Sequence, residues 1–319
     1  MTNQINSKYL SILKEEIYKQ NNTVREFDFC KDIDLLNSDK FFIDKISKEL
    51  CFIGKIEKKM KPNKDDILYG NLLENSDGSI EMITDLLKYL GHKACTIFCN
   101  ETYDINTMPI LFFDCELNNK SDHLYLRLWD GEQYSEAIQY CKDKTFTNKE
   151  VSMSNLQFNQ IFIDTDKIKF DEHERHTGWN KEGIKISNRH TRIQMIINLS
   201  TGKIRFLNDG KRFFFEPLLK MNKYNIMLTN NFDSRPKIRE LLCAQEEGYI
   251  YFKPLKITSR KQKLKLFYHG APKVEVFSER HKEWIRIKEN SIIDSSQEIM
   301  IRIKMSAMDI LYGMYLIGQ

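Results

Sequence analysis

The sequence predicts a mainly β protein with a mixed α/β N-terminal third and two β-sandwich-like modules in its C-terminal half. Three observations support this. Two stretches before Gly91 have apolar residues at helical spacing. After Gly91, short apolar runs bounded by Asn, Asp, Gly or Pro follow one another, which is typical of strands joined by turns. The length of 319 residues also favours more than one domain.

Both helical stretches are amphipathic. In "SKYLSILKEEIYKQ", Leu10, Leu13 and Ile17 form a narrow apolar stripe behind a candidate cap at Ser7. So short a helix is marginal in water and needs a surface to pack on, which either its own domain or a neighbouring subunit could supply. A second helix is predicted from about Ser79 to Leu90, with an apolar stripe formed by Ile80, Ile83, Leu86, Leu87 and Leu90.

The strand-like region begins with "ACTIFC", "PILFFDC" and "HLYLRLW". Residues 191–218 then read as a three-stranded meander, with turns at residues 200–202 and 208–210. In "VEVFSERHKEWIRI", residues 274–287, we expect two strands joined by a solvated turn. Trp284, which begins the second of these strands, is expected to fill the space between two sheets.

Polar stretches near residues 145–155 and 258–262 suggest the domain boundaries. The predicted domains are residues 1–150, which are mixed α/β, residues 151–258, which are β-sandwich-like, and residues 259–319, a C-terminal β-sandwich module. Residues 248–258 are a candidate extension of the last module.

Composition excludes several classes of protein. With 41% hydrophobic and 29% charged residues, the chain is expected to fold. The net charge of +4 comes from interspersed acids and bases, so nucleic acid is not expected as a partner. Seven irregularly spaced cysteines predict neither a disulfide framework nor metal clips, and no cofactor is expected. No stretch approaches ~18 consecutive apolar residues, and the N-terminus lacks the apolar core and cleavage site of a signal peptide. The sequence therefore predicts cytoplasmic synthesis without membrane insertion.

The segment from Gly248 to the end resembles the small β-sandwich domains of tailed-bacteriophage tail, baseplate and tail-fibre proteins. The resemblance covers about a quarter of the chain and is one of strand pattern. The matching elements are Lys253-Pro254-Leu255, Val274 to Phe277, Trp284 to Ile287, Ile299 to Lys304, and Tyr312-Gly313. Where such domains have Asp-Gly in a turn, this chain has Arg280 and His281. The resemblance implies a component of a tail-like particle.

A competing resemblance lies in the centre of the chain. The predicted helix from Ser79 and the following "SDHLYLRLWDGEQYSEAIQY" resemble the central part of arylamine N-acetyltransferases, which use a Cys nucleophile, a His and an acid. His123 and Glu136 match the last two, on the two strands of a hairpin with Asp130-Gly131 in its turn. Residues 70–82 contain no cysteine, so Ser76 would have to replace it.

Other chemistry has less support. His173, His176 and His190 are a weak alternative metal set, but Gly178 interrupts any helix that would align the first two, and a polar loop is favoured. Phosphate-binding glycine motifs are absent from the sequence. Aromatic residues make up 12% of the chain and include the clusters Phe213-Phe214-Phe215 and Tyr249-Tyr251. Exposed aromatics would suit stacking against sugars, although alternating aromatics in strands are more often core or interface residues.

The sequence therefore predicts a non-enzymatic structural or attachment component of a larger assembly, similar to a bacteriophage tail or baseplate, with possible glycan or cell-surface binding. Its expected partners are other subunits, including copies of itself, and its expected location is the virion or assembled particle. The alternative is an acyltransferase related to arylamine N-acetyltransferases, either altered to a Ser nucleophile or inactive.

Overall fold

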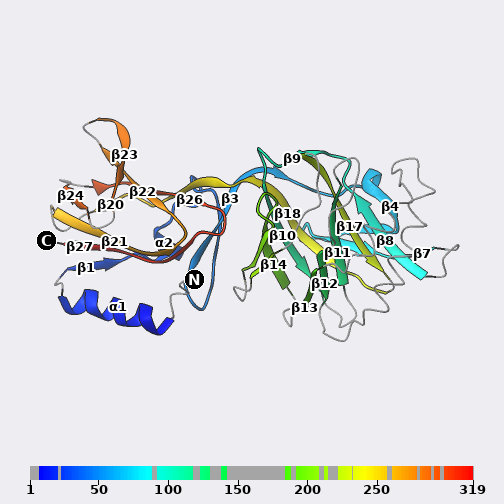
Figure 1. Cartoon of the computed structure of the whole chain (residues 1–319), viewed down its shortest axis with the longest axis horizontal. Helices are drawn as coiled ribbons and strands as arrows, with labels where there is room; N and C mark the ends of the chain where they lie inside the picture. The colour runs from blue at the N-terminus through cyan, green and yellow to red at the C-terminus, as the bar shows by residue number, and fades with distance from the viewer. Residues whose placement is uncertain are drawn as a thin grey trace. The chain divides into compact units, whose positions relative to one another are not determined.

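The computed structural model describes fourteen stretches of the chain. They are residues 7–20, 23–87, 92–117, 123–129, 138–141, 184–187, 192–207, 212–214, 222–231, 233–256, 261–278, 281–288, 291–294 and 298–318. This part is mainly β, with several antiparallel sheets (Figure 1). The predicted mainly β class is therefore confirmed.

Two compact units divide the chain. Unit 1 contains residues 1–55 and 247–319, and unit 2 contains residues 56–246. Unit 2 is thus inserted into unit 1 along the sequence. The predicted division at residues 150 and 258 does not coincide with these units, because the first 55 residues belong with the C-terminal segment and not with residues 56–150.

Unit 1 contains two main sheets. The first has the strand order β3-β27-β21-β24, with β1 beside β27 and β2 beside β3. The second has the order β19-β26-β22-β23. The bounds are β1 Val24–Glu26, β2 Lys40–Ile43, β3 Leu50–Lys59, β19 Glu247–Tyr251, β21 Lys261–His269, β22 Lys273–Ser278, β23 Glu283–Ile287, β24 Ile292–Asp294, β26 Ile301–Ser306 and β27 Ile310–Gly318; β20 Leu255–Lys256 pairs with β25 Glu298–Ile299, and the short helix α2 spans Phe29–Asp32.

One apolar core joins these two sheets. Alternate residues of β21 and β27 meet alternate residues of β19, β22 and β26 in a single buried cluster, because successive side chains of a strand point to opposite faces. Its members include Phe52, Ile250, Leu264, Ile301, Ile303 and Met314, all fully or almost fully buried.

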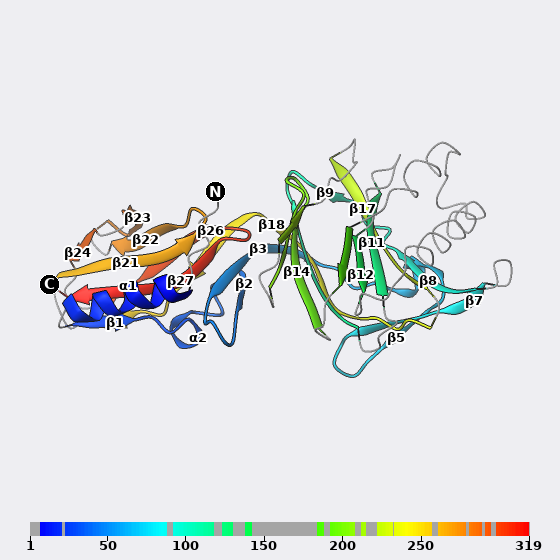
Figure 2. The same cartoon turned by 60° about the horizontal axis from the view of Figure 1, so that its bottom comes forward.

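The helix α1, Ser7–Gln20, lies along β1 and β27 on the outer side of the first sheet (Figure 2). The helix is confirmed as predicted. Ile17 is buried against Phe267, Tyr315 and Ile317, and Leu13 packs on the same cluster. Its own unit therefore supplies the surface that the apolar stripe needs, which answers the question that the sequence left open.

Glu26 ties this helix to the sheet. Its carboxylate accepts hydrogen bonds from Tyr315 Oη at 2.9 Å and from Lys14 Nζ at 3.1 Å. Tyr18 Oη donates a third bond at 3.2 Å. Burial alone raises the pKa of Glu26, but the three donors outweigh burial, so the pKa lies below its ordinary value of 4.5.

We expect Glu26 to make the stability of unit 1 depend on pH in the acid range. A lowered folded-state pKa stabilises the fold above the unfolded-state value near 4.5, and this contribution is lost as the pH falls through the folded-state pKa. Glu26→Gln should lower the free energy of unfolding by about 1 kcal/mol at neutral pH, since the group is partly exposed. It should also reduce the loss of stability as the pH falls. Thermal melts across pH 3 to 7 check this, with Glu15→Gln in an exposed pair as the control. If Glu26→Gln loses stability at acid pH as steeply as the intact chain does, the prediction is wrong.

Unit 2 also contains two main sheets. One has the order β16-β15-β14-β10-β18, with β6 beside β18 and β5 beside β6; the other has the order β13-β12-β11-β17-β8-β4, with β7 beside β8 and β9 beside β17. The bounds are β4 Ile67–Tyr69, β5 Asn71–Glu74, β6 Ile80–Ile83, β7 Asp85–Leu87, β8 His92–Phe98, β9 Tyr103–Asp104, β10 Ile110–Glu116, β11 His123–Trp129, β12 Ile138–Cys141, β13 Ile184–Ser187, β14 Arg192–Asn198, β15 Lys203–Phe206, β16 Arg212–Phe214, β17 Lys223–Asn231 and β18 Lys237–Gln245, with a short 3₁₀ turn η1 at Lys64–Asp66.

A second core lies between these sheets. Leu111, Phe113 and Cys115 of β10 meet Leu124, Leu126 and Leu128 of β11 and the apolar residues of β14, β17 and β18 in one buried cluster. The predicted meander is present, since β14, β15 and β16 pair antiparallel in order. Its first turn uses Gly202 at φ +68°, where an L side chain would be strained. The second predicted turn, at residues 208–210, lies outside the described residues.

The predicted helix from Ser79 to Leu90 is wrong. Residues 80–83 form β6, and residues 85–87 form β7. The apolar spacing fits both periods, but in β6 the buried Ile80 and Met82 alternate with the partly exposed Glu81 and Ile83. An Asp77-Gly78 turn folds β5 onto β6, and β18 pairs with β6 on its other side, so sheet pairing decides the outcome. Without this helix, strands predominate in the described N-terminal third, which also contains α1 and α2.

Candidate functional site

Three aromatic side chains surround one arginine on the outer face of the second sheet of unit 1, and a fourth packs beside them. Tyr249 and Tyr251 of β19 and Trp284 of β23 lie around Arg302 of β26, and Phe277 of β22 contacts Trp284. All are partly exposed. We call this surface the aromatic face. It brings together residues 53 positions apart in the sequence, because β19 and β22 both pair with β26, and β23 pairs with β22.

Strand alternation places these side chains on one face. In β26, Ile301, Ile303 and Met305 are buried in the core, so Arg302 and Lys304 point outward. In β19, Ile250 is in the core, so Tyr249 and Tyr251 point outward. Register completes the set, since Tyr251 lies opposite Arg302 and Phe277 lies opposite Trp284.

Trp284 is not the core residue that the sequence suggested. The predicted hairpin is confirmed, with β22 and β23 paired antiparallel from Val274–Ile287 to Ser278–Glu283. Because Val274 and Val276 point to the core, Phe277 points outward, and so does its partner Trp284. The indole is partly exposed. Its ring centroid lies 5.5 Å from that of Phe277 and 5.9 Å from that of Tyr251.

Arg302 is the centre of the aromatic face. Its guanidinium carbon lies 4.3 Å from the ring centroid of Tyr249 and 4.4 Å from that of Trp284, distances at which cation–π attraction is strong. Arg302 Nε donates to Glu275 Oε2 at 2.7 Å, and Arg302 Nη1 donates to Tyr251 Oη at 3.2 Å. Burial by itself lowers the pKa of Arg302, but these acceptors raise it above its ordinary value, so the group stays charged. The rings are thereby fixed around one cation.

The segment before β2 supports the edge of this sheet. Asp34 N donates to Tyr251 O at 2.8 Å, and Tyr251 N donates to Ser38 Oγ at 2.8 Å. Asp39 Oδ2 accepts from Tyr249 N at 2.7 Å. Gly248 permits this approach, since a Cβ there would lie 2.5 Å from Asp39 Oδ2. Both tyrosines are thus held on a paired, rigid strand.

The sequence-based catalytic set is only partly within the described residues. Ser76 lies exposed in the turn between β5 and β6, at Asn75–Ser79, and not at the start of a helix. His123 is the first residue of β11, opposite Cys141 of β12, and these two strands form the predicted antiparallel pair. Glu136, Asp130 and Gly131 lie outside the described residues, as do His173, His176 and His190.

Three buried cysteine thiols of unit 2 are not suited to replace the missing nucleophile. Burial raises the pKa of Cys95 to about 12 and also raises the pKa of Cys99 and Cys115. A nucleophilic cysteine needs the opposite shift toward thiolate. Across the part of the chain that the structure describes, no group of three or more His, Cys, Asp or Glu side chains is arranged to hold a metal ion.

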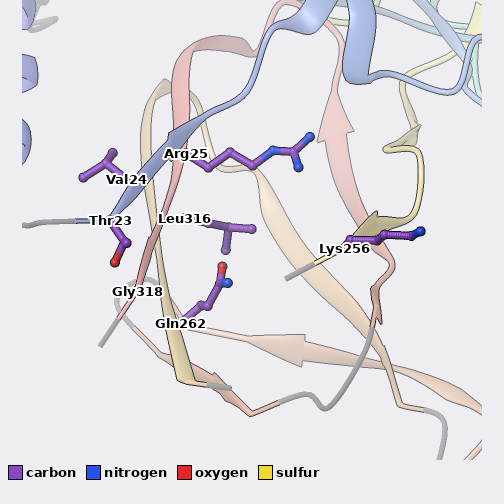
Figure 3. Close-up of a pocket in the computed structure, with 7 residues that line it drawn as sticks. All are labelled: Thr23, Val24, Arg25, Lys256, Gln262, Leu316 and Gly318. Atoms are coloured by element: carbon purple, nitrogen blue, oxygen red, sulfur yellow. The ribbon is translucent and has the colours of Figure 1, made fainter. Parts of the chain in front are cut away.

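A pocket of about 350 Å³ lies elsewhere in unit 1, beside β1, β20, β21 and β27 (Figure 3). Its lining includes Arg25, Lys256 and the buried Gln262. The side chains of Arg25 and Lys256 point away from Gln262 in Figure 3, and the guanidinium of Arg25 is paired with Asp32 at 3.4 Å. The pocket therefore does not converge its polar groups on one point, as a ligand site does.

The sequence shows Tyr249 and Tyr251 as an aromatic cluster and predicts Trp284 as a core residue. It does not predict that the three side chains lie together on one face. The alternation in "YIY" and "IRIKM" is readable from the sequence, and it places Tyr249, Tyr251 and Arg302 on faces opposite to core residues. Which strands become neighbours, and in which register, is not readable.

Comparisons with known proteins do not assign the chain to a family. No protein-family model and no curated protein matches the chain. Among solved structures, a xanthan lyase from Paenibacillus matches with 8% identity and a TM-score of 0.20, over 89% of this chain and 27% of the lyase chain. The chain therefore spans about a quarter of the lyase, and a TM-score of this size does not establish a shared fold. None of the described helices is long and apolar enough to span a membrane.

Proposed function

We propose that this protein is a non-catalytic attachment subunit of a larger assembly, such as a bacteriophage tail or baseplate, and that the aromatic face binds glycan. The observation that carries the proposal is the grouping of Tyr249, Tyr251, Phe277 and Trp284 around Arg302 on a rigid sheet. Aromatic rings on rigid strands offer sugar C–H groups a flat surface with a negative face, while the fixed polar atoms can bond to hydroxyls.

Three further features support this proposal. Partly exposed aromatic side chains on a soluble surface cost solubility, so their concentration on one sheet face indicates an interaction site. The C-terminal segment whose strand pattern resembles phage attachment domains, from Gly248 onward, contains all five residues of the aromatic face. Each unit also has two sheets around one core, a β-sandwich-like arrangement that suits a module presenting a binding face.

Trp284→Ala should weaken glycan binding strongly without unfolding the protein. Loss of two aromatic contacts and one cation–π contact at a partly exposed site should cost about 1 to 2 kcal/mol of stability, below the 3 to 5 expected for a core tryptophan. We expect at least a tenfold loss of retention on an immobilised polysaccharide that the intact chain binds. Affinity electrophoresis over a broad panel of polysaccharides measures it.

Tyr268→Ala is the matched control, because Tyr268 is an exposed aromatic residue of β21, on the other sheet of the same unit. It should bind as the intact chain does. Failure of the intact chain to bind any member of the panel, or unchanged binding by Trp284→Ala, would refute the glycan site. An acyltransferase remains the alternative, but no observation on the described residues favours it.

A further inference from the structure

We infer that the glycan bound by the aromatic face is acidic, with carboxylate groups on some of its sugars. This inference rests on the proposed function and adds the chemical class of the ligand. It follows from the charges that share the face with the rings.

The aromatic face has an excess of cations. Four cationic side chains point outward from these strands, and they are accompanied by two carboxylates: Lys273, Arg286, Arg302 and Lys304 against Glu247 and Glu275. The difference, four minus two, is a net charge of two positive units. Arg302 is paired with Glu275, and Lys304 is paired with Glu247 at 2.5 Å. Within the described residues, no carboxylate lies at ion-pair distance from Lys273 or Arg286.

Lys273 and Lys304 are direct cross-strand partners in β22 and β26. Like charges directly opposite one another destabilise a sheet. Glu247 forms an ion pair with Lys304 and attracts Lys273 only at longer range. The hydrogen bond to Glu247 raises the pKa of Lys304, so Lys304 stays charged. Two adjacent lysines beside the ring of Tyr249, which lies opposite Lys304, form a place where a carboxylate could be held between cations.

The same charges argue against a single-stranded nucleic acid. Such a ligand also stacks on aromatic rings, but it presents a phosphate at every nucleotide and requires a groove that is positive along its length. Glu247 and Glu275 lie among the cations of this face and would repel a continuous row of phosphates. A glycan that has carboxylates on only some of its sugars can place neutral sugars beside Glu247 and Glu275.

The test compares acidic polysaccharides with their own carboxyl-reduced forms, which keep the sugar backbone and remove the charge. We expect the full chain to bind at least one acidic polymer about tenfold more tightly than its reduced form at low salt, and to lose that difference at high salt. The double variant Lys273→Gln/Arg286→Gln should no longer prefer the acidic polysaccharide, but it should still bind the carboxyl-reduced form. Lys203→Gln, an exposed lysine of unit 2, is the charge control.

The outcomes separate this inference from the proposed function. Equal binding of acidic and reduced forms, or an unchanged preference in the double variant, refutes the acidic ligand and leaves a neutral glycan site. Binding of neither form refutes both proposals. Tighter binding of a single-stranded oligonucleotide than of any acidic glycan also refutes the inference. We expect the double variant Lys273→Gln/Arg286→Gln to melt at or above the temperature of the intact chain, since Lys273→Gln relieves the repulsion with Lys304. Such a melt excludes unfolding as the cause of lost binding.

Discussion

Replacing Arg192 with methionine should destabilise the protein by about 3 to 5 kcal/mol, because it leaves a buried carboxylate without its counter-charge. Asp114 of β10 is fully buried. Arg192 Nε donates to Asp114 Oδ1 at 2.9 Å, a second guanidinium nitrogen bonds to Oδ2, and Gln194 Nε2 donates at 3.0 Å. Methionine keeps the apolar stem of the side chain, so the loss reports the missing charge and its hydrogen bonds to Asp114.

Chemical denaturation of the full chain measures this effect, and two variants control it. Asp114→Asn/Arg192→Met removes both charges and should recover most of the loss, because an uncharged pair needs no counter-ion. Arg235→Met removes an arginine that is 60% exposed and 3.9 Å from Glu81, and it should change stability by less than about 0.5 kcal/mol. Equal losses of stability in Arg192→Met and Arg235→Met would show that breaking the buried pair costs no more than breaking an exposed one.

Deleting residues 1–20 should lower the melting temperature and cause self-association. The helix α1 buries Ile17, which is 3% exposed, and covers Phe267, Tyr315 and Ile317 of the sheet. Loss of Ile17 packing alone should cost about 2 to 5 kcal/mol, and the uncovered apolar surface should promote association. A thermal melt and light scattering on the truncated and intact chains measure both effects.

Two substitutions within α1 sharpen this test. Ile17→Ala should reproduce much of the loss in stability, whereas Ile12→Ala, at a position 47% exposed on the same helix, should not. A truncated chain that melts as the intact one does, and that no longer forms the oligomers the intact chain forms, would instead identify the helix as an anchor to a neighbouring subunit.

Much of the local structure was predictable from the sequence. The helix at residues 7–20, the strand-rich region after Gly91, the first turn of the meander and the hairpin of residues 274–287 follow from apolar periodicity and turn residues, which act between near neighbours. The segment from Ser79 to Leu90 was misread for the same reason. Its short apolar run fits a helix and a strand equally well by spacing, and only pairing with β5 and β18 decided between them.

The sequence by itself determined which residues alternate between core and surface, and therefore that Tyr249, Tyr251 and Arg302 point away from the core residues of their strands. The tertiary structure alone decided that the first 55 residues join the C-terminal segment in one unit, that Trp284 faces outward, and that the rings surround Arg302. These outcomes depend on strand order and register between distant segments. A shift of one residue in the pairing of β22 with β23 would turn Trp284 to the other face, so its outward position depends on the register that pairs it with Phe277.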